Sequence, residues 1–249
     1  MMPLSFVVVC EAHADFEMAA TLVDRTLCEY VDLMEPQVID SYRQYKGIRP
    51  ESPFLTWGES SEVAKKLGRR AHGHFQGKPG DLDAIAGRKA ILVVLDQFPD
   101  VKSIFLIRDS DGLTARKAGL NQARAEVKAT NFVVVIGVAH CKREAWVLAG
   151  FDPRDEEEHR LIDELRQELG FHPCEQNHQL HATHDGDKRS AKRVLAILVR
   201  GDRDREAACW RETPLHSLHQ RGTENDLVHF LNEVKDRVVP LFSGPRSVA

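Results

Sequence analysis

The chain has 249 residues, a formal net charge of −4 at pH 7 and the apolar fraction of an ordinary globular protein. The slightly acidic balance excludes a protein that binds nucleic acid through its overall charge, and leaves room only for a local basic patch. Five scattered cysteines without a C-x-x-C spacing favour free thiols in a reducing cytoplasm. Residues 7–9 are too short an apolar run for a signal peptide or a membrane span, so we expect a cytoplasmic protein that does not contact the membrane.

In chain order, apolar strand patterns alternate with helical spacing. Buried strands are predicted at 4–10, 103–107 and 132–138, with a weaker strand pattern at 37–45. Helices are predicted at 16–30, 61–67, 81–97 and 114–128. Strands that alternate with helices predict an α/β fold with a mostly parallel sheet flanked by helices.

The chain after residue 151 has a different character. Helices are predicted at 153–169, 190–199, 203–211 and 224–241, with a His-rich loop at 171–187. We therefore expect residues 1–150 to form the sheet-bearing core and residues 151–249 to form a mostly helical extension packed on it.

Carboxylates follow two of the predicted strands. The strand at 103–107 leads to Asp109 and Asp111, and the strand at 4–10 leads to Glu11, with Asp15 four residues later. Ligands of open α/β sheets bind beyond the carboxyl ends of the strands, where these acids are expected to lie. Several carboxylates in one cluster repel one another unless a cation neutralises them, and hard cations such as Mg²⁺ prefer oxygen ligands. The pattern favours a divalent metal site, although an Asp-Ser-Asp-Gly turn in solvent is the plain alternative.

These motifs resemble the TOPRIM superfamily of topoisomerases, primases and OLD-family nucleases. Val9-Cys10-Glu11-Ala12-His13-Ala14-Asp15 matches the first motif at both acids, with alanine at position 12 where the family usually has glycine. Ile107-Arg108-Asp109-Ser110-Asp111 matches the later Asp-x-Asp strand. Together with Arg143-Glu144-Ala145-Trp146 and Asp187-Lys188-Arg189, the chain looks like the small bacterial TOPRIM-like proteins of the DUF4276 type.

The resemblance implies a TOPRIM-like fold and phosphodiester hydrolysis of DNA or RNA that depends on Mg²⁺ or Mn²⁺. It implies that Asp109 and Asp111 hold the metal, and that Glu11 is either a ligand or the general acid/base. Asp15 would support a second metal, since two-metal sites hold both the attacking and the leaving oxygen.

Two further residues are candidates for the same site. Glu144 is either another metal ligand or an ordinary acid in the first turn of a helix. Lys188 is either a catalytic cation that neutralises developing phosphate charge or a solvated lysine. The basic run that contains Lys188, Arg189, Lys192 and Arg193 is the predicted contact with nucleic acid.

Rival interpretations stay open. Asp109-Ser110-Asp111-Gly112 also resembles the first motif of haloacid-dehalogenase phosphatases, in which Asp109 would be a nucleophile, but such motifs normally follow the first strand. A non-catalytic TOPRIM-like module is the third possibility. Proteins of this sort can work beside an ABC-type or AAA ATPase in anti-phage defence, and this sequence has no phosphate-binding loop of its own.

The His-rich loop raises the question of zinc. Cys174, His178, His181 and His184 lie close together in the sequence, but their spacing matches no zinc-finger pattern. A polar loop near the nucleic-acid groove is the favoured interpretation.

Overall fold

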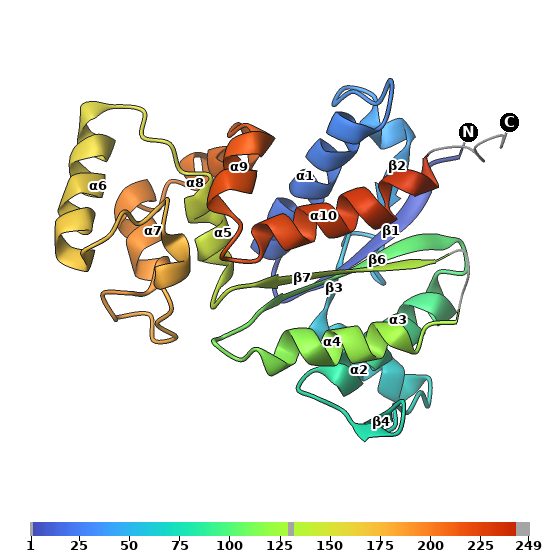
Figure 1. The fold of residues 1–249 in the computed structure, drawn as a ribbon. Helices are drawn as coiled ribbons and strands as arrows, with labels where there is room; N and C mark the ends of the chain where they lie inside the picture. Colours follow the sequence, from blue (N-terminus) through green and yellow to red (C-terminus); the bar gives the residue numbers. More distant parts are fainter. Residues whose placement is uncertain (1, 129–131, 243–249) are drawn as a thin grey trace, which may run out of the picture. The chain divides into compact units, whose positions relative to one another are not determined.

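The computed structural model describes residues 2–128 and 132–242 and has an α/β fold (Figure 1). Within these residues the main sheet has five strands in the order β2-β1-β6-β7, with β3 also paired to β1. The strands are β1 (Leu4–Cys10), β2 (Arg43–Tyr45), β3 (Leu55–Thr56), β6 (Val101–Asp109) and β7 (Val133–Ala139). A separate antiparallel pair consists of β4 (His74–Phe75) and β5 (Lys78–Pro79). The mostly parallel sheet confirms the predicted fold class.

Strand β1 is the centre of the sheet. It pairs in parallel with β2, β3 and β6, and its register with β6 runs from Phe6 opposite Ser103 to Val9 opposite Leu106. Residues 6–10 are completely buried, as expected for a parallel strand whose two faces are both covered.

Helices cover both faces of this sheet. Figure 1 shows α1 (His13–Tyr30) and the C-terminal part of α10 (Leu227–Arg237) on one face. The other face carries α2 (Trp57–Lys66), α3 (Ala84–Gln97) and α4 (Ala115–Ala125). Just beyond α10, the ring of Phe242 packs edge-on against the ring of Phe6, with centroids 6.2 Å apart. Residues from the two ends of the sequence therefore share one core.

Two local predictions differ from the structure. Helix α2 begins four residues before Ser61, because Thr56 and Glu59 form a capping box in which the Thr56 hydroxyl accepts a 3.1 Å bond from the Glu59 amide. The predicted strand at 37–45 is shorter than expected, because Ile39–Ser41 forms a 3₁₀ turn (η1) and only β2 is extended.

Contacts along the chain define two compact units. The first comprises Met1–Ile107, Thr114–Gly137 and Phe230–Ala249, and the second comprises Arg108–Leu113 and Val138–His229. The predicted division into residues 1–150 and 151–249 stays a prediction.

The second unit is built mainly of helices. They are α5 (Arg143–Ala149), α6 (Glu156–Leu169), α7 (Ala191–Val199), α8 (Arg203–Arg211) and α9 (Leu215–Arg221), with a 3₁₀ turn (η2) at Asn177–Gln179. A last 3₁₀ turn (η3), Val239–Leu241, belongs to the first unit.

A buried polar network holds the second unit together. The side-chain amide of Asn225 donates to Ala145 O at 3.0 Å and to Asn177 Oδ1 at 2.6 Å. The backbone carbonyl of Asn225 accepts a bond from Trp146 Nε1 at 2.7 Å. The same carbonyl accepts a bond from the backbone amide of His140. Both asparagines are completely buried, so each of these bonds satisfies a group that water cannot reach. The network fixes the start of α5 and the turn that precedes it.

A buried ion pair adds to this framework. The Arg205 guanidinium donates to Glu158 Oε1 at 2.6 Å, and its central carbon lies 4.0 Å from the centre of the Phe151 ring. Hydrogen bonds from Arg205 lower the pKa of Glu158 below its ordinary value. Since each group is paired, the cost of burying the two charges is offset.

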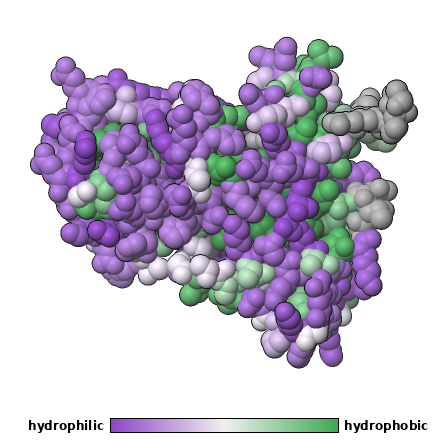
Figure 2. Space-filling view, in the orientation of Figure 1, coloured by the Kyte–Doolittle hydropathy of each residue, from purple (hydrophilic) through white to green (hydrophobic). Residues whose placement is uncertain are grey.

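The molecular surface is mainly hydrophilic on the face drawn in Figure 2. Large apolar side chains that are strongly exposed include Met2 and Leu33, at 87% and 88%. In the part of the chain that the structure describes, no helix combines the length and the apolarity needed to cross a bilayer.

Candidate functional site

The two N-terminal acids of the predicted site lie in the first unit. Glu11 follows β1 directly and is exposed. Asp15 is half-buried in the first turn of α1, where its Oδ2 accepts a 2.8 Å bond from the Ala12 amide. Asp15 therefore helps to cap α1, and its negative charge is also favourable at the helix N-terminus.

The Asp-x-Asp motif lies in the second unit at the end of β6. Asp109 is the last residue of the strand, and its Oδ1 accepts a 2.7 Å bond from the backbone amide of Arg143 at the start of α5. Asp111 adopts the left-handed conformation with φ 47°, followed by Gly112 with φ 75°. The chain therefore turns sharply at Asp111 and Gly112.

The segment after β7 interlocks with this turn. The Ser110 amide donates to Ala139 O and the Asp111 amide donates to Cys141 O, both at 2.9 Å. In return, the buried amide of Cys141 donates a 2.7 Å bond to Ser110 Oγ. We call this arrangement of residues 109–112 and 139–143 the double turn.

The double turn stores backbone strain. Cys141 has φ 57°, so both Asp111 and Cys141 are non-glycine residues in the left-handed region. Each such residue costs on the order of 1–3 kcal/mol, and such conformations cluster at functional sites. Five other described residues, Leu33, Gln76, Asp83, Arg200 and Asp226, share this conformation, so the strain alone does not distinguish the double turn from other turns of the fold.

Burial and nearby charges determine the protonation of Cys141 in the double turn. Burial raises the pKa of the Cys141 thiol; Lys142 opposes this shift, while Asp111, Asp109 and Glu144 add to it. The thiol therefore stays protonated, which excludes Cys141 as a thiolate nucleophile near neutral pH.

Glu144 and the neighbouring arginine are held inside the second unit. Arg143 Nη2 lies 3.8 Å from Glu144 Oε1 and 2.8 Å from Glu206 Oε1. Glu144 lies in the first turn of α5, as its alternative interpretation predicted. Its role as a metal ligand stays a prediction.

The loop that carries Lys188 packs beside the double turn. Its base is closed by the Ala182 amide, which donates to Arg189 O at 3.2 Å, and the Cys141 thiol donates to Ala182 O at 3.6 Å. Lys188 itself is exposed, and its carbonyl accepts a 3.4 Å bond from Arg193.

Two basic residues near Lys188 form ion pairs with one acidic side chain. Lys192 Nζ lies 2.7 Å from Asp185 Oδ2, and Lys142 binds the other oxygen of the same carboxylate. Hydrogen bonds from Lys142 and Lys192 lower the pKa of Asp185 to about 2.

The two arginines of the basic run also have partners within the protein. Arg193 Nη2 lies 3.0 Å from Glu168 Oε1, and Arg189 lies over the Phe171 ring at 5.5 Å. Helix α7 begins at Ala191, so Arg189 lies before the helix that carries Lys192 and Arg193 and does not share a helix face with them. The basic run therefore offers less uncompensated positive charge than its sequence suggests.

Two histidines of the loop accept hydrogen bonds from nearby backbone amides. His172 Nδ1 accepts bonds from the amides of Cys174 and Glu175, and His184 Nδ1 accepts one from Gly186. Among the residues that the structure describes, no group of three or more His, Cys, Asp or Glu side chains is arranged to hold a metal ion.

The chemistry of the acids is nevertheless suited to a hard cation. A carboxylate has about four acceptor sites on two oxygens, and the bond from the Arg143 amide to Asp109 Oδ1 uses one of them. Glu11 and Asp15 belong to one unit, whereas Asp109, Asp111, Glu144 and Lys188 belong to the other. Their convergence on a magnesium or manganese ion therefore stays a prediction.

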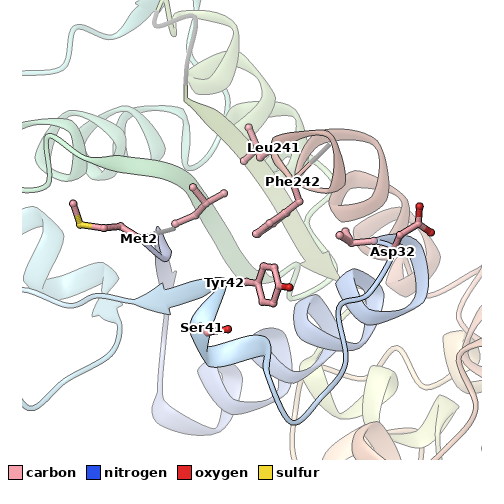
Figure 3. Close-up of a pocket in the computed structure, with 8 residues that line it drawn as sticks. Met2, Asp32, Ser41, Tyr42, Leu241 and Phe242 are labelled. Carbon is pink, nitrogen blue, oxygen red and sulfur yellow. The ribbon is translucent and has the colours of Figure 1, made fainter. Parts of the chain in front are cut away.

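A pocket in the first unit lies at the other end of β1. Its volume is about 490 Å³, and Met2, Leu4, Tyr42 and Phe242 are among the residues that line it (Figure 3). Leu4 begins β1 and Glu11 follows its last residue, so the pocket and Glu11 are separated by the length of the strand, about 23 Å at ~3.3 Å per residue. The pocket is not part of the predicted acidic site.

Comparison of the chain with family models, with curated proteins and with solved structures found no match. The resemblance to the TOPRIM superfamily thus rests on the motifs themselves.

Proposed function

We propose that the protein is a metal-dependent nuclease of TOPRIM type, in which Glu11, Asp109 and Asp111 form the metal site with Asp15 alongside. One observation carries the proposal. Strands β1 and β6 are parallel neighbours, paired up to Val9 and Leu106. Glu11 follows two residues after the first of these and Asp109 three residues after the second. Acids therefore follow the carboxyl ends of adjacent parallel strands, the usual place for a site in such sheets.

The residues of the double turn have distinct tasks in this proposal. The Arg143 amide fixes the carboxylate of Asp109, and the Ser110 hydroxyl fixes the turn between the two aspartates. Lys188 supplies positive charge for a phosphate group. A bound divalent cation would polarise the phosphate and lower the pKa of the attacking water.

The test is a nuclease assay on single- and double-stranded DNA and RNA with Mg²⁺, Mn²⁺ or EDTA. We expect cleavage that requires the metal and falls at least 100-fold in Asp109→Asn and in Asp111→Asn. The amide side chain introduced by Asp109→Asn keeps an oxygen that can accept the bond from the Arg143 amide, so the fold is preserved while the charge is lost. Asp163→Asn, an exposed acid on α6, is the matched control.

Three outcomes would contradict the proposal. Unchanged cleavage by Asp109→Asn would place the activity elsewhere. Turnover of a phosphomonoester without nuclease activity would favour the dehalogenase-like phosphatase. Failure of the wild-type chain to bind Mn²⁺ in a calorimetric titration would favour the non-catalytic module.

We also propose, from the resemblance alone, that a partner ATPase controls this activity in an anti-phage defence system. Full activity of the isolated chain with Mg²⁺ would show that no partner is needed.

A further inference from the structure

A basic cleft lies in the first unit between α2 and α3. Its volume is about 500 Å³, and its lining includes Lys65, Arg69, Arg70 and Lys89 but no acidic residue. The cationic residues thus make up half of the residues that line it. We refer to this group of four as the basic cleft.

The local structure explains why these cations come together. Helix α2 ends in a Schellman motif: Gly68, with φ 65°, donates to Lys65 O at 3.1 Å, and the Arg69 amide donates to Ala64 O at 2.8 Å. The motif reverses the chain directly after Lys65, so Arg69 and Arg70 return toward the same helix end.

The two helices contribute matching faces to the cleft. Ser61 and Lys65 are four residues apart on α2, and Ile85 and Lys89 are four residues apart on α3. Residues at this spacing lie on one face of a helix, so each helix presents one lysine to the cleft.

Most of this positive charge is not compensated. Arg69 forms a two-point ion pair with Asp96, including a 2.7 Å bond from Nη2 to Oδ1. Within residues 2–128 and 132–242, Lys65, Arg70 and Lys89 form no ion pair. Like charges that line one cleft repel one another, so an anion in the cleft would relieve that repulsion.

We propose that the basic cleft binds consecutive phosphates of a nucleic-acid backbone. Three uncompensated cations exceed the single charge of one phosphodiester, which favours a chain of phosphates over an isolated one. The choice of nucleic acid rests on the proposed nuclease function. It also relocates the contact from the basic run at 188–193, where three of the cations already have partners.

The experiment is fluorescence anisotropy of labelled single- and double-stranded oligonucleotides with the full chain in EDTA, so that binding is read without cleavage. The test variant is Lys65→Gln with Lys89→Gln. The control is Lys66→Gln with Lys78→Gln, which removes the same charge from exposed lysines outside the cleft. Circular dichroism checks that both variants are folded.

We expect the cleft variant to bind at least tenfold more weakly at moderate salt, with the control unchanged. The slope of log affinity against log salt should fall by about 0.7–0.9 for each lysine that contacts a phosphate. An equal loss in both variants, an unchanged slope, or no binding by the wild-type chain would overturn the inference. Calorimetry with inorganic phosphate and pyrophosphate is the second arm, and binding of these ions without nucleic acid would mark a small-anion site instead.

The binding and cleavage tests can fail separately. Asp109→Asn should bind the oligonucleotide normally and fail to cut it. Normal oligonucleotide binding by a wild-type chain that neither cleaves nucleic acid nor binds Mn²⁺ would leave the basic cleft supported and the nuclease proposal refuted.

Discussion

The substitution Ser110→Ala tests whether the double turn depends on one side-chain hydrogen bond. The Ser110 hydroxyl accepts a 2.7 Å bond from the Cys141 amide, and both residues are buried. Its second bond, from the Gly112 amide at 3.4 Å, is long and adds little. An unsatisfied buried amide costs ~1–3 kcal/mol, so we expect a loss of about 2 kcal/mol in the free energy of unfolding.

The chain supplies a matched control on β6, the strand that ends just before Ser110. Ser103 is completely buried, and its hydroxyl has no hydrogen-bond partner among the described residues. Ser103→Ala removes an unsatisfied polar group, so we expect no loss of stability and a gain of up to about 1 kcal/mol. The two Ser→Ala changes should therefore have different signs.

Two measurements read this difference. Urea unfolding followed by circular dichroism gives the stability of the chain. Hydrogen–deuterium exchange of a peptide covering residues 138–144 reports on the double turn itself, which matters because a chain with two units need not unfold in one step. Equal shifts of the urea midpoint in both variants, with no faster exchange in Ser110→Ala, would refute the reasoning.

Three further predictions concern the framework around the sites. Asn225→Ala removes three hydrogen bonds that this side chain makes in the core, so unfolding in urea should show a loss of about 3 kcal/mol, and a loss below ~1 kcal/mol would contradict the network. Because its partners lower the pKa of Asp185 to about 2, its ion pairs should stay intact above roughly pH 4 and be lost as the pH falls toward 2; an NMR titration of the carboxyl carbon with a midpoint near 4 would disprove this. Gly119→Ala should destabilise the protein by more than ~1 kcal/mol, since the new Cβ would lie 1.9 Å from Leu82 O, whereas Gly58→Ala has room and should raise the melting temperature; similar shifts in both would argue against the close approach.

The three long strands β1, β6 and β7 were predictable because their signal is local, whereas the two-residue strands β3, β4 and β5 were not predicted. An apolar, β-branched run between polar residues identified β1 at its observed bounds, 4–10. Helix α9 was not predicted, because a seven-residue helix with a single buried residue, Leu218, has no apolar periodicity. The capping-box residues Thr56 and Glu59 could have identified the start of α2 from the sequence, although the helix was predicted to begin at Ser61.

The candidate site was predictable in its position but not in its contacts. Acids at strand ends can be read from the sequence, whereas the bond from the Arg143 amide to Asp109 joins residues that are 34 positions apart. The strain at Cys141 has no sequence signal either, since cysteine is not a residue that favours the left-handed region. The cleft at residues 65–70 was not predicted, because the Schellman motif and the packing of α3, which bring its cations together, depend on the fold.

The pairing of Phe6 with Phe242 has a consequence for biosynthesis. A ribosome makes β1 early, yet the residues that complete its unit, from Phe230 onward, emerge only after the whole segment 138–229 of the other unit has been made. At about 5–20 residues per second, that delay is on the order of ten seconds. During this interval the nascent sheet lacks part of its cover, which makes the chain a candidate for chaperone binding until translation has passed residue 242.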